Sequence, residues 1–361
     1  MTDIIPLQIN GQTQSCPLVL AGPCSAETEE QVMTTARQLA QAGVKIFRAG
    51  IWKPRTMPGN FEGVGEKGLP WLQRVKKETK MAVATEVATP AHVEACLKAG
   101  VDIVWVGART SANPFAIQEI AESLRGADNV HVLVKNPLNP DLAAWVGALE
   151  RLHAAGIRRL GAIHRGFSFF GPHLYRNPPL WRVAFDLHLR IPQLQIIVDP
   201  SHIAGRRDLV PRLCMGALAM GFDGLIIESH CNPDEAWSDA SQQITPAELA
   251  ELMPSFRFRH GEPSSDTLTE LRRQIDNADD ELIDLLARRM QISDEIGRFK
   301  HRTSMPIVQT GRFEALMSDR VKSAAKLGMS ESFIRAVLAA IHEESVRRQT
   351  EIAEAHSDIP L

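Results

Sequence analysis

The sequence predicts an α/β protein, a (β/α)8 TIM barrel followed by an all-α region of three helices. Up to residue 254, short apolar runs alternate with amphipathic stretches of helical spacing, and eight such units fill roughly 240 residues, the size of such a barrel. After Pro254 the strand pattern stops, and apolar residues recur three and four apart. The alternative is a doubly wound open sheet, which gathers its ligands at one switch point and does not use every strand end.

The strands are expected to be buried on both faces. Their apolar runs are continuous, without the alternation that marks a half-exposed strand. The clearest runs cover residues 18–21, 103–106, 132–134, 196–198 and 225–227. Helices are expected between the strands, for example at residues 29–42, 90–99, 113–124 and 141–154.

The chain is expected to divide into a barrel at residues 1–254, a linker at 255–265 and a helical domain at 266–361. Gly, Pro and Ser interrupt any periodicity in the linker. A heptad seam that starts at residue 268 predicts one helix of more than about 30 residues, and further helices are expected near 310–327 and 330–355. Because about 90 residues in three helices bury a modest core, this domain is expected to form a homodimer.

Composition and charge exclude several classes of protein. The chain has 361 residues and a formal net charge of −3, which gives no reason to expect nucleic acid or an anionic membrane as a partner. No apolar stretch is long enough to span a membrane, and no secretory signal is visible. Five cysteines without close pairing fit a reducing compartment. We therefore expect a cytoplasmic protein.

Nearly every predicted strand ends on a polar residue that can carry chemistry. In a parallel barrel the C-terminal ends of all strands converge on one face, where active sites lie. The residues at these ends are Cys24, Arg48, Glu86, Arg109, Lys135, Arg165, His202 and Glu228. Four candidate metal ligands are Cys24, His202, Glu228 and Asp239. One sulfur, one nitrogen and two oxygen ligands suit Mn, Fe, Co or Zn and disfavour Mg or Ca.

The same face carries cations, and these predict anionic substrates. They are Arg48, Lys53, Arg55, Arg109, Lys135 and Arg165. Arg suits bidentate contact with phosphate or carboxylate, so this set predicts substrates that together carry two phosphates and a carboxylate. Internal ion pairs with Glu86, Asp199 or Glu228 could absorb two or three of the cations, but not all. No nucleotide cofactor is expected, because the only GxGxxG motif (residues 63–68) does not follow a strand.

Seven segments of the barrel region resemble one enzyme family. They are Ala21–Ser25, Lys53–Thr56, Gly107–Arg109, Val134–Pro137, His164–Gly166, Asp199–His202 and Ile227–His230. They are similar to 3-deoxy-D-arabino-heptulosonate 7-phosphate (DAHP) synthase, the first enzyme of the shikimate pathway, and the short N-terminal segment resembles its compact subgroup. The nearest alternative is the related synthase that uses arabinose 5-phosphate, whose counterpart of Lys53–Thr56 usually differs. A metal-dependent aldolase is more remote.

The resemblance implies a reaction and assigns roles to barrel residues. Phosphoenolpyruvate would be held by Arg48, Arg109, Lys135 and Arg165. Erythrose 4-phosphate would be held by Lys53, Arg55 and Thr56, and both Lys53 and Lys135 are expected to take part in catalysis. A divalent metal on the four ligands named above would polarise the aldehyde oxygen as the two substrates condense.

Arg289 stands where the heptad seam of the helical region requires an apolar residue. Burying an unpaired guanidinium is costly, so this side chain is either paired within the protein or bound to an anion. Lys300 lies on nearly the same helix face, whereas Arg272 lies about 100° away from it. A partner chain could supply Arg272 to the same pocket.

The helical region resembles the all-helical chorismate mutase family over about residues 266–352. The segments that carry this resemblance are Leu271–Ile275, Asp279–Arg289, Gly297–Lys300, Arg312 and Glu344–Gln349. It implies an intertwined dimer in which the carboxylates of chorismate are held by Arg272, Arg289 and Arg312. Lys300 and Gln349 would stabilise the ether oxygen as the bond breaks, with Ser345 in the same pocket. Gln309 and Phe313 replace acidic residues frequent in that family, so the alternative is a ligand sensor with little mutase activity.

The two resemblances together predict a bifunctional enzyme of aromatic amino-acid biosynthesis. It would form DAHP from phosphoenolpyruvate and erythrose 4-phosphate, and prephenate from chorismate. Because the barrel shows no regulatory domain of its own, the helical domain is expected to regulate it, in the first place through inhibition by prephenate.

Overall fold

The computed structural model describes residues 1–8, 16–54, 59–258, 266–308 and 310–355. Contacts within the chain divide it into two compact units, Met1–His260 and Gly261–Leu361. Most of the expected linker, residues 259–265, lies outside the described residues. None of the described helices combines the length and the apolar character needed to cross a membrane.

The first unit is a closed barrel of eight parallel strands that pair in sequence order. The strands are β1 (Leu18–Gly22), β2 (Ile46–Arg48), β3 (Ala82–Val87), β4 (Ile103–Val106), β5 (His131–Lys135), β6 (Leu160–His164), β7 (Gln195–Val198) and β8 (Gly224–Glu228). β8 pairs with β1 along its whole length, which closes the ring. The prediction of a TIM barrel is confirmed, and the doubly wound alternative is excluded because an open sheet has two edges.

The strand residues alternate between two apolar cores. Leu18 and Leu20 of β1 belong to the cluster inside the barrel, together with Trp105. Val19 and Ala21 belong to the larger cluster between the strands and the helices. Successive side chains of a strand point to opposite faces, so a strand with two covered faces needs apolar residues at every position. This explains the continuous apolar runs of the sequence.

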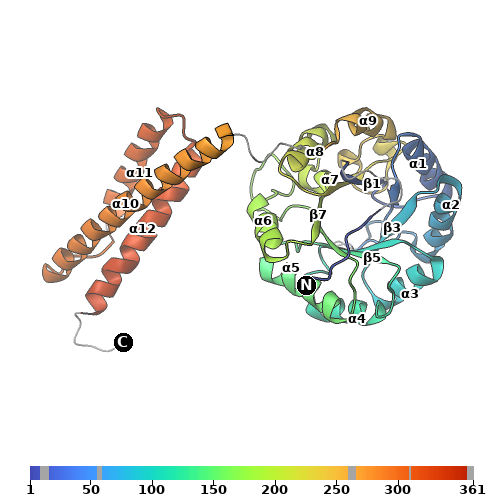
Figure 1. Ribbon diagram of the computed structural model, residues 1–361, viewed down its shortest axis with the longest axis horizontal. Helices are drawn as coiled ribbons and strands as arrows, with labels where there is room; N and C mark the ends of the chain where they lie inside the picture. Colours follow the sequence, from blue (N-terminus) through green and yellow to red (C-terminus); the bar gives the residue numbers. More distant parts are fainter. Residues whose placement is uncertain (9–15, 55–58, 259–265, 309, 356–361) are drawn as a thin grey trace. The chain divides into compact units, whose positions relative to one another are not determined.

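Helices surround the strands on the outside of the ring (Figure 1). They are α1 (Glu29–Gln41), α2 (Leu69–Thr79), α3 (Pro90–Ala99), α4 (Pro114–Ser123), α5 (Leu142–Ala154), α6 (Trp181–Arg190), α7 (Pro200–Ala204), α8 (Val210–Ala219) and α9 (Pro246–Leu252). The four helices named from periodicity coincide with α1, α3, α4 and α5 to within one residue at each end. Their first turns are capped by the side chains of Thr28, Thr89, Asn113 and Asp141.

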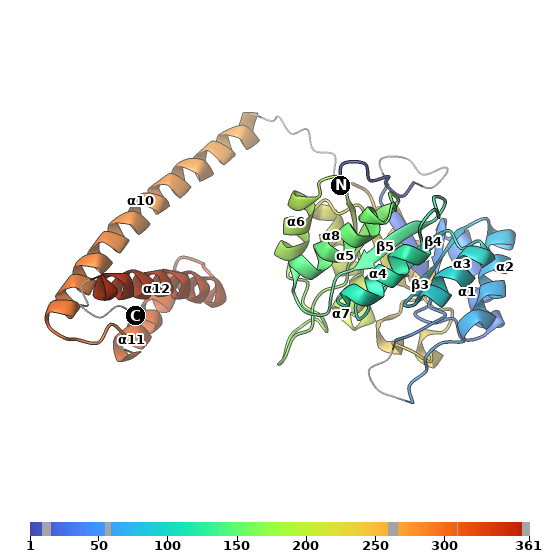
Figure 2. The same ribbon diagram turned by 90° about the horizontal axis from the view of Figure 1, so that it is seen from below.

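The described part of the second unit consists of α10 (Asp266–Arg302), α11 (Thr310–Ala325) and α12 (Glu331–Glu354). α10 is 37 residues long, and its first half extends beyond the other two helices (Figure 2). Ser330 caps α12 by accepting a hydrogen bond from the backbone N–H of Phe333. The prediction of a long helix followed by two shorter ones is confirmed.

Candidate active sites

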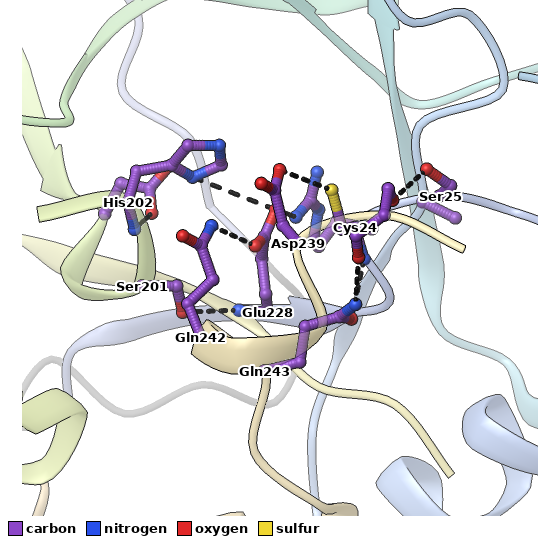
Figure 3. A network of polar contacts seen from close by, with 12 residues as sticks. Cys24, Ser25, Ser201, His202, Glu228, Asp239, Gln242 and Gln243 are labelled. Carbon is purple, nitrogen blue, oxygen red and sulfur yellow. Dashed lines mark hydrogen bonds and ion pairs between the residues drawn. The ribbon is translucent and has the colours of Figure 1, made fainter. Parts of the chain in front are cut away.

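Three candidate metal ligands meet at the C-terminal end of the barrel. Cys24 follows β1, Glu228 ends β8 and Asp239 lies in the loop after β8. One ligand atom from each lies within 4.8 Å of the other two, and Figure 3 shows the three side chains converging. The thiol of Cys24 donates a hydrogen bond to Asp239 Oδ2 at 3.3 Å and accepts one from Lys53 Nζ at 3.1 Å.

His202 lies beside this cluster. Its Nδ1 is 2.9 Å from Asp199 Oδ2 and 3.8 Å from Glu228 Oε1. Asp199 also caps α7 by accepting a hydrogen bond from the His202 backbone N–H. One carboxylate therefore orients both the backbone and the ring of His202.

Burial and neighbouring charges set the protonation states in the cluster. Burial and the carboxylate of Glu228 raise the pKa of Cys24 to about 12, so the thiol keeps the proton that it donates to Asp239. Burial by itself raises the pKa of the Glu228 carboxyl, but His202 and Arg48 outweigh it and the pKa is lowered. The pKa of Asp239 is lowered in the same way, against burial, by His202 and Arg176. Both carboxylates are therefore ionised at neutral pH.

These residues fit a divalent transition metal. A thiol, a histidine and two ionised carboxylates form the mixed ligand set that such ions accept. The thiolate is the form of cysteine that binds metals, so an ion at this site would displace the thiol proton of Cys24.

Two of the predicted substrate-binding cations form ion pairs inside the protein. Arg48 Nη1 donates to Glu228 Oε1 at 2.9 Å, and the guanidinium lies 4.8 Å from the centre of the Trp105 ring. Lys135 Nζ donates to Asp199 Oδ2 at 2.9 Å. Both cations are almost fully buried. The internal ion pairing considered as an alternative therefore takes up these two cations.

The remaining predicted substrate-binding residues of the barrel have different surroundings. Arg165 is buried, its Nη1 donates to Asn177 Oδ1 at 2.9 Å, and burial lowers its pKa to about 10. Arg109 is exposed after β4. Arg55 and Thr56 lie outside the described residues.

Sequence reasoning missed polar residues that support the metal ligands. Gln242 Nε2 donates to Glu228 Oε2 at 2.6 Å. Arg176 Nη1 donates to Asp239 Oδ1 at 3.0 Å and to Gln242 Oε1 at 2.9 Å. Arg176 lies in a loop and Gln242 ends a 3-10 helix of three residues, Ala240–Gln242, and both segments are too short or too irregular for a periodic pattern. The one available signal is that Gln242 follows Asp239 closely in the chain.

A second polar cluster lies between α10 and α12. Arg289 Nη1 donates a hydrogen bond to Ser345 Oγ at 2.7 Å. Lys300 Nζ donates to Gln349 Oε1 at 3.3 Å and to the carbonyl of Ile307 at 2.6 Å. Within the described residues, neither cation forms an ion pair with a carboxylate. The structure thus brings together four of the residues predicted for this pocket.

The other residues predicted for this pocket are placed differently. Arg272 is exposed in the first half of α10, and a rise of ~1.5 Å per residue puts it about 26 Å from Arg289 along the helix. Arg312 belongs to α11, but its side chain and the whole of Gln309 lie outside the description. Phe313 stacks on His342 of α12 with ring centroids 4.0 Å apart, and sequence reasoning did not identify His342.

Comparisons with known proteins find relatives that match about two thirds of this chain. A phospho-2-dehydro-3-deoxyheptonate aldolase of Thermotoga maritima is 36% identical over 226 residues, which cover 63% of this chain and 64% of that protein. The chain therefore spans less than two thirds of that relative's length. A 2-dehydro-3-deoxyphosphooctonate aldolase of Protochlamydia amoebophila is 28% identical over 258 residues, covering 66% of this chain and 90% of the relative.

A solved structure and two family models assign the units. The crystal structure of a DAHP synthase from Thermotoga maritima matches with a TM-score of 0.61 and 31% identity, covering 69% of this chain and 71% of that one. Residues 5–257 match the DAHP synthetase I family, and residues 271–350 match chorismate mutase type II. The chain belongs to the DAHP synthetase I family, and its barrel is followed by a chorismate mutase type II domain.

Proposed function

We propose that this chain is a bifunctional enzyme of the shikimate pathway. The barrel condenses phosphoenolpyruvate with erythrose 4-phosphate to DAHP and phosphate in a metal-dependent reaction. The helical domain rearranges chorismate to prephenate. The observation that carries the proposal is the cluster of Cys24, Glu228 and Asp239, surrounded by cations at the end of the barrel where TIM-barrel enzymes act.

In the barrel, the cations bind and orient the two substrates. Arg109 and Arg165 hold the anionic groups of phosphoenolpyruvate, and the Lys135–Asp199 pair keeps the ring of His202 in place. A divalent metal held by Cys24, His202, Glu228 and Asp239 would act as a Lewis acid towards the aldehyde oxygen. Lys53 Nζ lies 3.1 Å from Cys24 Sγ. In the proposed reaction it donates a hydrogen bond to the aldehyde oxygen as that oxygen gains negative charge. Carbon 3 of phosphoenolpyruvate bonds to the aldehyde carbon, water adds at carbon 2, and the bond from carbon 2 to the phosphate oxygen breaks.

The second substrate of the barrel, an aldose phosphate, distinguishes the two kinds of relative described above, the phospho-2-dehydro-3-deoxyheptonate aldolase and the 2-dehydro-3-deoxyphosphooctonate aldolase. We propose erythrose 4-phosphate, because the Lys53–Thr56 segment resembles the DAHP synthases and because the Thermotoga maritima relative is the more similar of the two described above. The test supplies either erythrose 4-phosphate or arabinose 5-phosphate and follows the consumption of phosphoenolpyruvate. We expect a strong preference for erythrose 4-phosphate. Condensation with arabinose 5-phosphate alone would instead place the barrel with relatives such as the 2-dehydro-3-deoxyphosphooctonate aldolase.

Removal of Arg109 or Arg165 is expected to impair the use of phosphoenolpyruvate. A hydrogen bond to a charged group contributes roughly 1.5–3 kcal/mol, so each alanine variant should lose about 10- to 150-fold in kcat/KM for this substrate. Steady-state kinetics with each substrate varied in turn measures this. Arg151→Ala, exposed on α5, is the matched control and should behave as the wild type. A larger effect on the KM for erythrose 4-phosphate would reverse the assignment.

In the helical pocket, catalysis requires positioning and electrostatics without a covalent step. Arg289 binds a carboxylate of chorismate. Lys300 stabilises the negative charge that develops on the ether oxygen as the carbon–oxygen bond breaks. Gln349 contacts Lys300 and is itself oriented by a hydrogen bond of 2.9 Å from its Nε2 to Ser293 Oγ.

We propose that a second copy of the chain completes this pocket. Apolar side chains along α10 are more than half exposed: Leu271, Ile275, Leu282, Leu285 and Ile292. A heptad seam that faces water within one chain is the pattern of a helix that packs against a partner. A homodimer covers this seam and brings the exposed Arg272 of one copy to the pocket of the other.

We propose that prephenate inhibits the synthase reaction through the helical pocket. Such coupling requires that prephenate bind more tightly to a state of the chain with lower synthase activity. Typical coupling energies correspond to about 5- to 150-fold, so saturating prephenate should lower the initial synthase rate of the full-length chain clearly. Chorismate and the aromatic amino acids are weaker candidates for the same effect.

A substitution in the helical pocket separates this inhibition from competition at the barrel. Arg289→Ala should leave the uninhibited synthase rate unchanged and abolish the response to prephenate. An unchanged rate of the wild type at saturating prephenate would show that the two domains are joined without regulation.

A further inference from the structure

His342 occupies an unassigned position in the helical pocket. It precedes Ser345 by three residues and Gln349 by seven on α12. At about 100° per residue, these three side chains lie on one face of the helix. Ser345 contacts Arg289 and Gln349 contacts Lys300. The face of α12 that carries His342 is therefore the face that meets the cations of α10.

Phe313 fixes the orientation of the His342 ring. The two ring centroids are 4.0 Å apart and the ring planes differ by 25°. One face of the imidazole is thus covered by an aromatic side chain from α11. The imidazole keeps its nitrogens at the ring edge, so stacking leaves them able to form hydrogen bonds.

Ser345 and Gln349, the other two side chains that α12 is described as placing in this pocket, are already engaged. Ser345 Oγ accepts a hydrogen bond from Arg289 and donates one to the carbonyl of Ile341 at 2.8 Å. Gln349 accepts from Lys300 and donates to Ser293. Among the described residues, none forms a hydrogen bond with the ring nitrogens of His342. Among the three described side chains on this face of α12, the imidazole of His342 is therefore the one that remains available for a hydrogen bond with a ligand.

The charge state of His342 determines what it can recognise. Burial, together with the charges of Arg289 and Lys300, lowers its pKa, so the ring is neutral at neutral pH. A neutral imidazole offers one N–H donor and one acceptor nitrogen. A hydroxyl group also offers a donor and an acceptor, whereas the carboxylates and the ether oxygen of the ligand suit the two cations.

We propose that His342 binds the ring hydroxyl of the ligand in the helical pocket, with Phe313 holding the imidazole in position. The proposal rests on the proposed mutase function, because it takes chorismate and prephenate, which both carry a ring hydroxyl, as the ligands. Under this proposal, His342 is a neutral group that binds the hydroxyl. It lies beside Phe313, one of the positions at which the sequence of this chain departs from the chorismate mutase family.

The test compares two ligands on the full-length chain. The ligands are chorismate and the chorismate analogue in which hydrogen replaces the ring hydroxyl. The variants are His342→Ala and His342→Gln, with Glu343→Ala, exposed at the next position of α12, as the matched control. We measure kcat/KM for chorismate and the inhibition constant of the analogue, and monitor folding by thermal unfolding and by the synthase rate.

We expect His342→Ala to lower kcat/KM for chorismate about 2- to 12-fold, the range of one neutral hydrogen bond. His342→Gln should lose less, because an amide also donates and accepts, and Glu343→Ala should match the wild type. The inhibition constant of the analogue should be the same for wild type and His342→Ala, because the interaction lost in the variant is absent from that ligand. An unchanged kcat/KM, or an equal loss for both ligands, would overturn the proposal.

A calorimetric measurement separates this proposal from the mutase function itself. If the wild type converts no chorismate, the proposed mutase function is wrong. The affinity for prephenate, measured by titration calorimetry on the wild type and on His342→Ala, then tests the contact between His342 and the ring hydroxyl. Weaker binding of prephenate by His342→Ala supports the hydroxyl contact, and equal binding by both proteins overturns it.

Discussion

Replacing Cys24 with alanine is expected to abolish the synthase reaction and the tight binding of a divalent metal. Cys24 supplies one of the three ligand atoms that lie within 4.8 Å of one another. Loss of a residue that merely supports a ligand already costs about 10- to 100-fold in metal affinity, so loss of the ligand itself should cost at least roughly 100-fold. His202→Ala should act in the same direction, although its ring lies at the edge of the cluster.

Metal content and synthase rate are measured on the same preparations. Treatment with a chelator should remove the activity of the wild type, and several divalent transition metals should restore it. Cys214→Ala is the matched control, because Cys214 is fully buried like Cys24 but lies on α8. Wild-type metal affinity and activity in Cys24→Ala, or full activity of a protein shown to be free of metal, would refute the metal site.

Replacing Arg289 with alanine is expected to reduce chorismate conversion by at least two orders of magnitude. Removal of one preorganised donor from a charge-stabilising site typically costs about 10²–10³ in kcat. Arg289 is held by Ser345 at 2.7 Å, and no described carboxylate competes with the substrate for it. The measurement is the rate of chorismate loss, with the synthase rate recorded in the same sample.

The neighbouring arginine provides the control for this substitution. Arg288 is exposed on the same turn of α10, and Arg288→Ala should retain the wild-type mutase rate. A folded Arg289→Ala protein that converts chorismate as fast as the wild type would exclude the pocket between α10 and α12.

Local sequence patterns were sufficient to predict the barrel. Strands covered on both faces need apolar residues at every position, as Leu18–Ala21 illustrates, and such runs are visible without knowledge of long-range contacts. The parallel arrangement then placed the ends of all strands at one face. For this reason the meeting of Cys24 with Glu228, which are far apart in the chain, could be predicted from strand order alone.

The sequence named Asp199 and Glu228 as possible ion-pair partners, but which cation would meet which carboxylate could not be predicted in this way. Arg48 was expected to bind phosphoenolpyruvate, and the structure places it on Glu228, 180 residues later in the chain. Lys135 likewise lies on Asp199. Whether a buried cation meets a carboxylate or stays available for a substrate depends on the direction of each side chain at the barrel end. Spacing along the sequence does not encode that direction.

In the helical domain too, local sequence patterns predicted the helices and their faces, but not the contacts between helices. Periodicity predicted the helices and placed Arg289 and Lys300 on one face of α10, because both properties follow from the geometry of a single helix. The stacking of Phe313 on His342 depends on how α11 packs against α12. No pattern within one helix reports that packing, so Phe313 could be noticed as a departure but its partner could not be found.

The central claim is that one chain carries two separate active sites. It is tested most directly by assaying both reactions in single preparations of the full-length wild type, Cys24→Ala and Arg289→Ala, with metal supplied and prephenate removed. We expect the wild type to form both DAHP and prephenate, Cys24→Ala to lose only the first reaction, and Arg289→Ala to lose only the second. A wild type that forms neither product, or a loss of both reactions from either substitution in a folded protein, would contradict this claim.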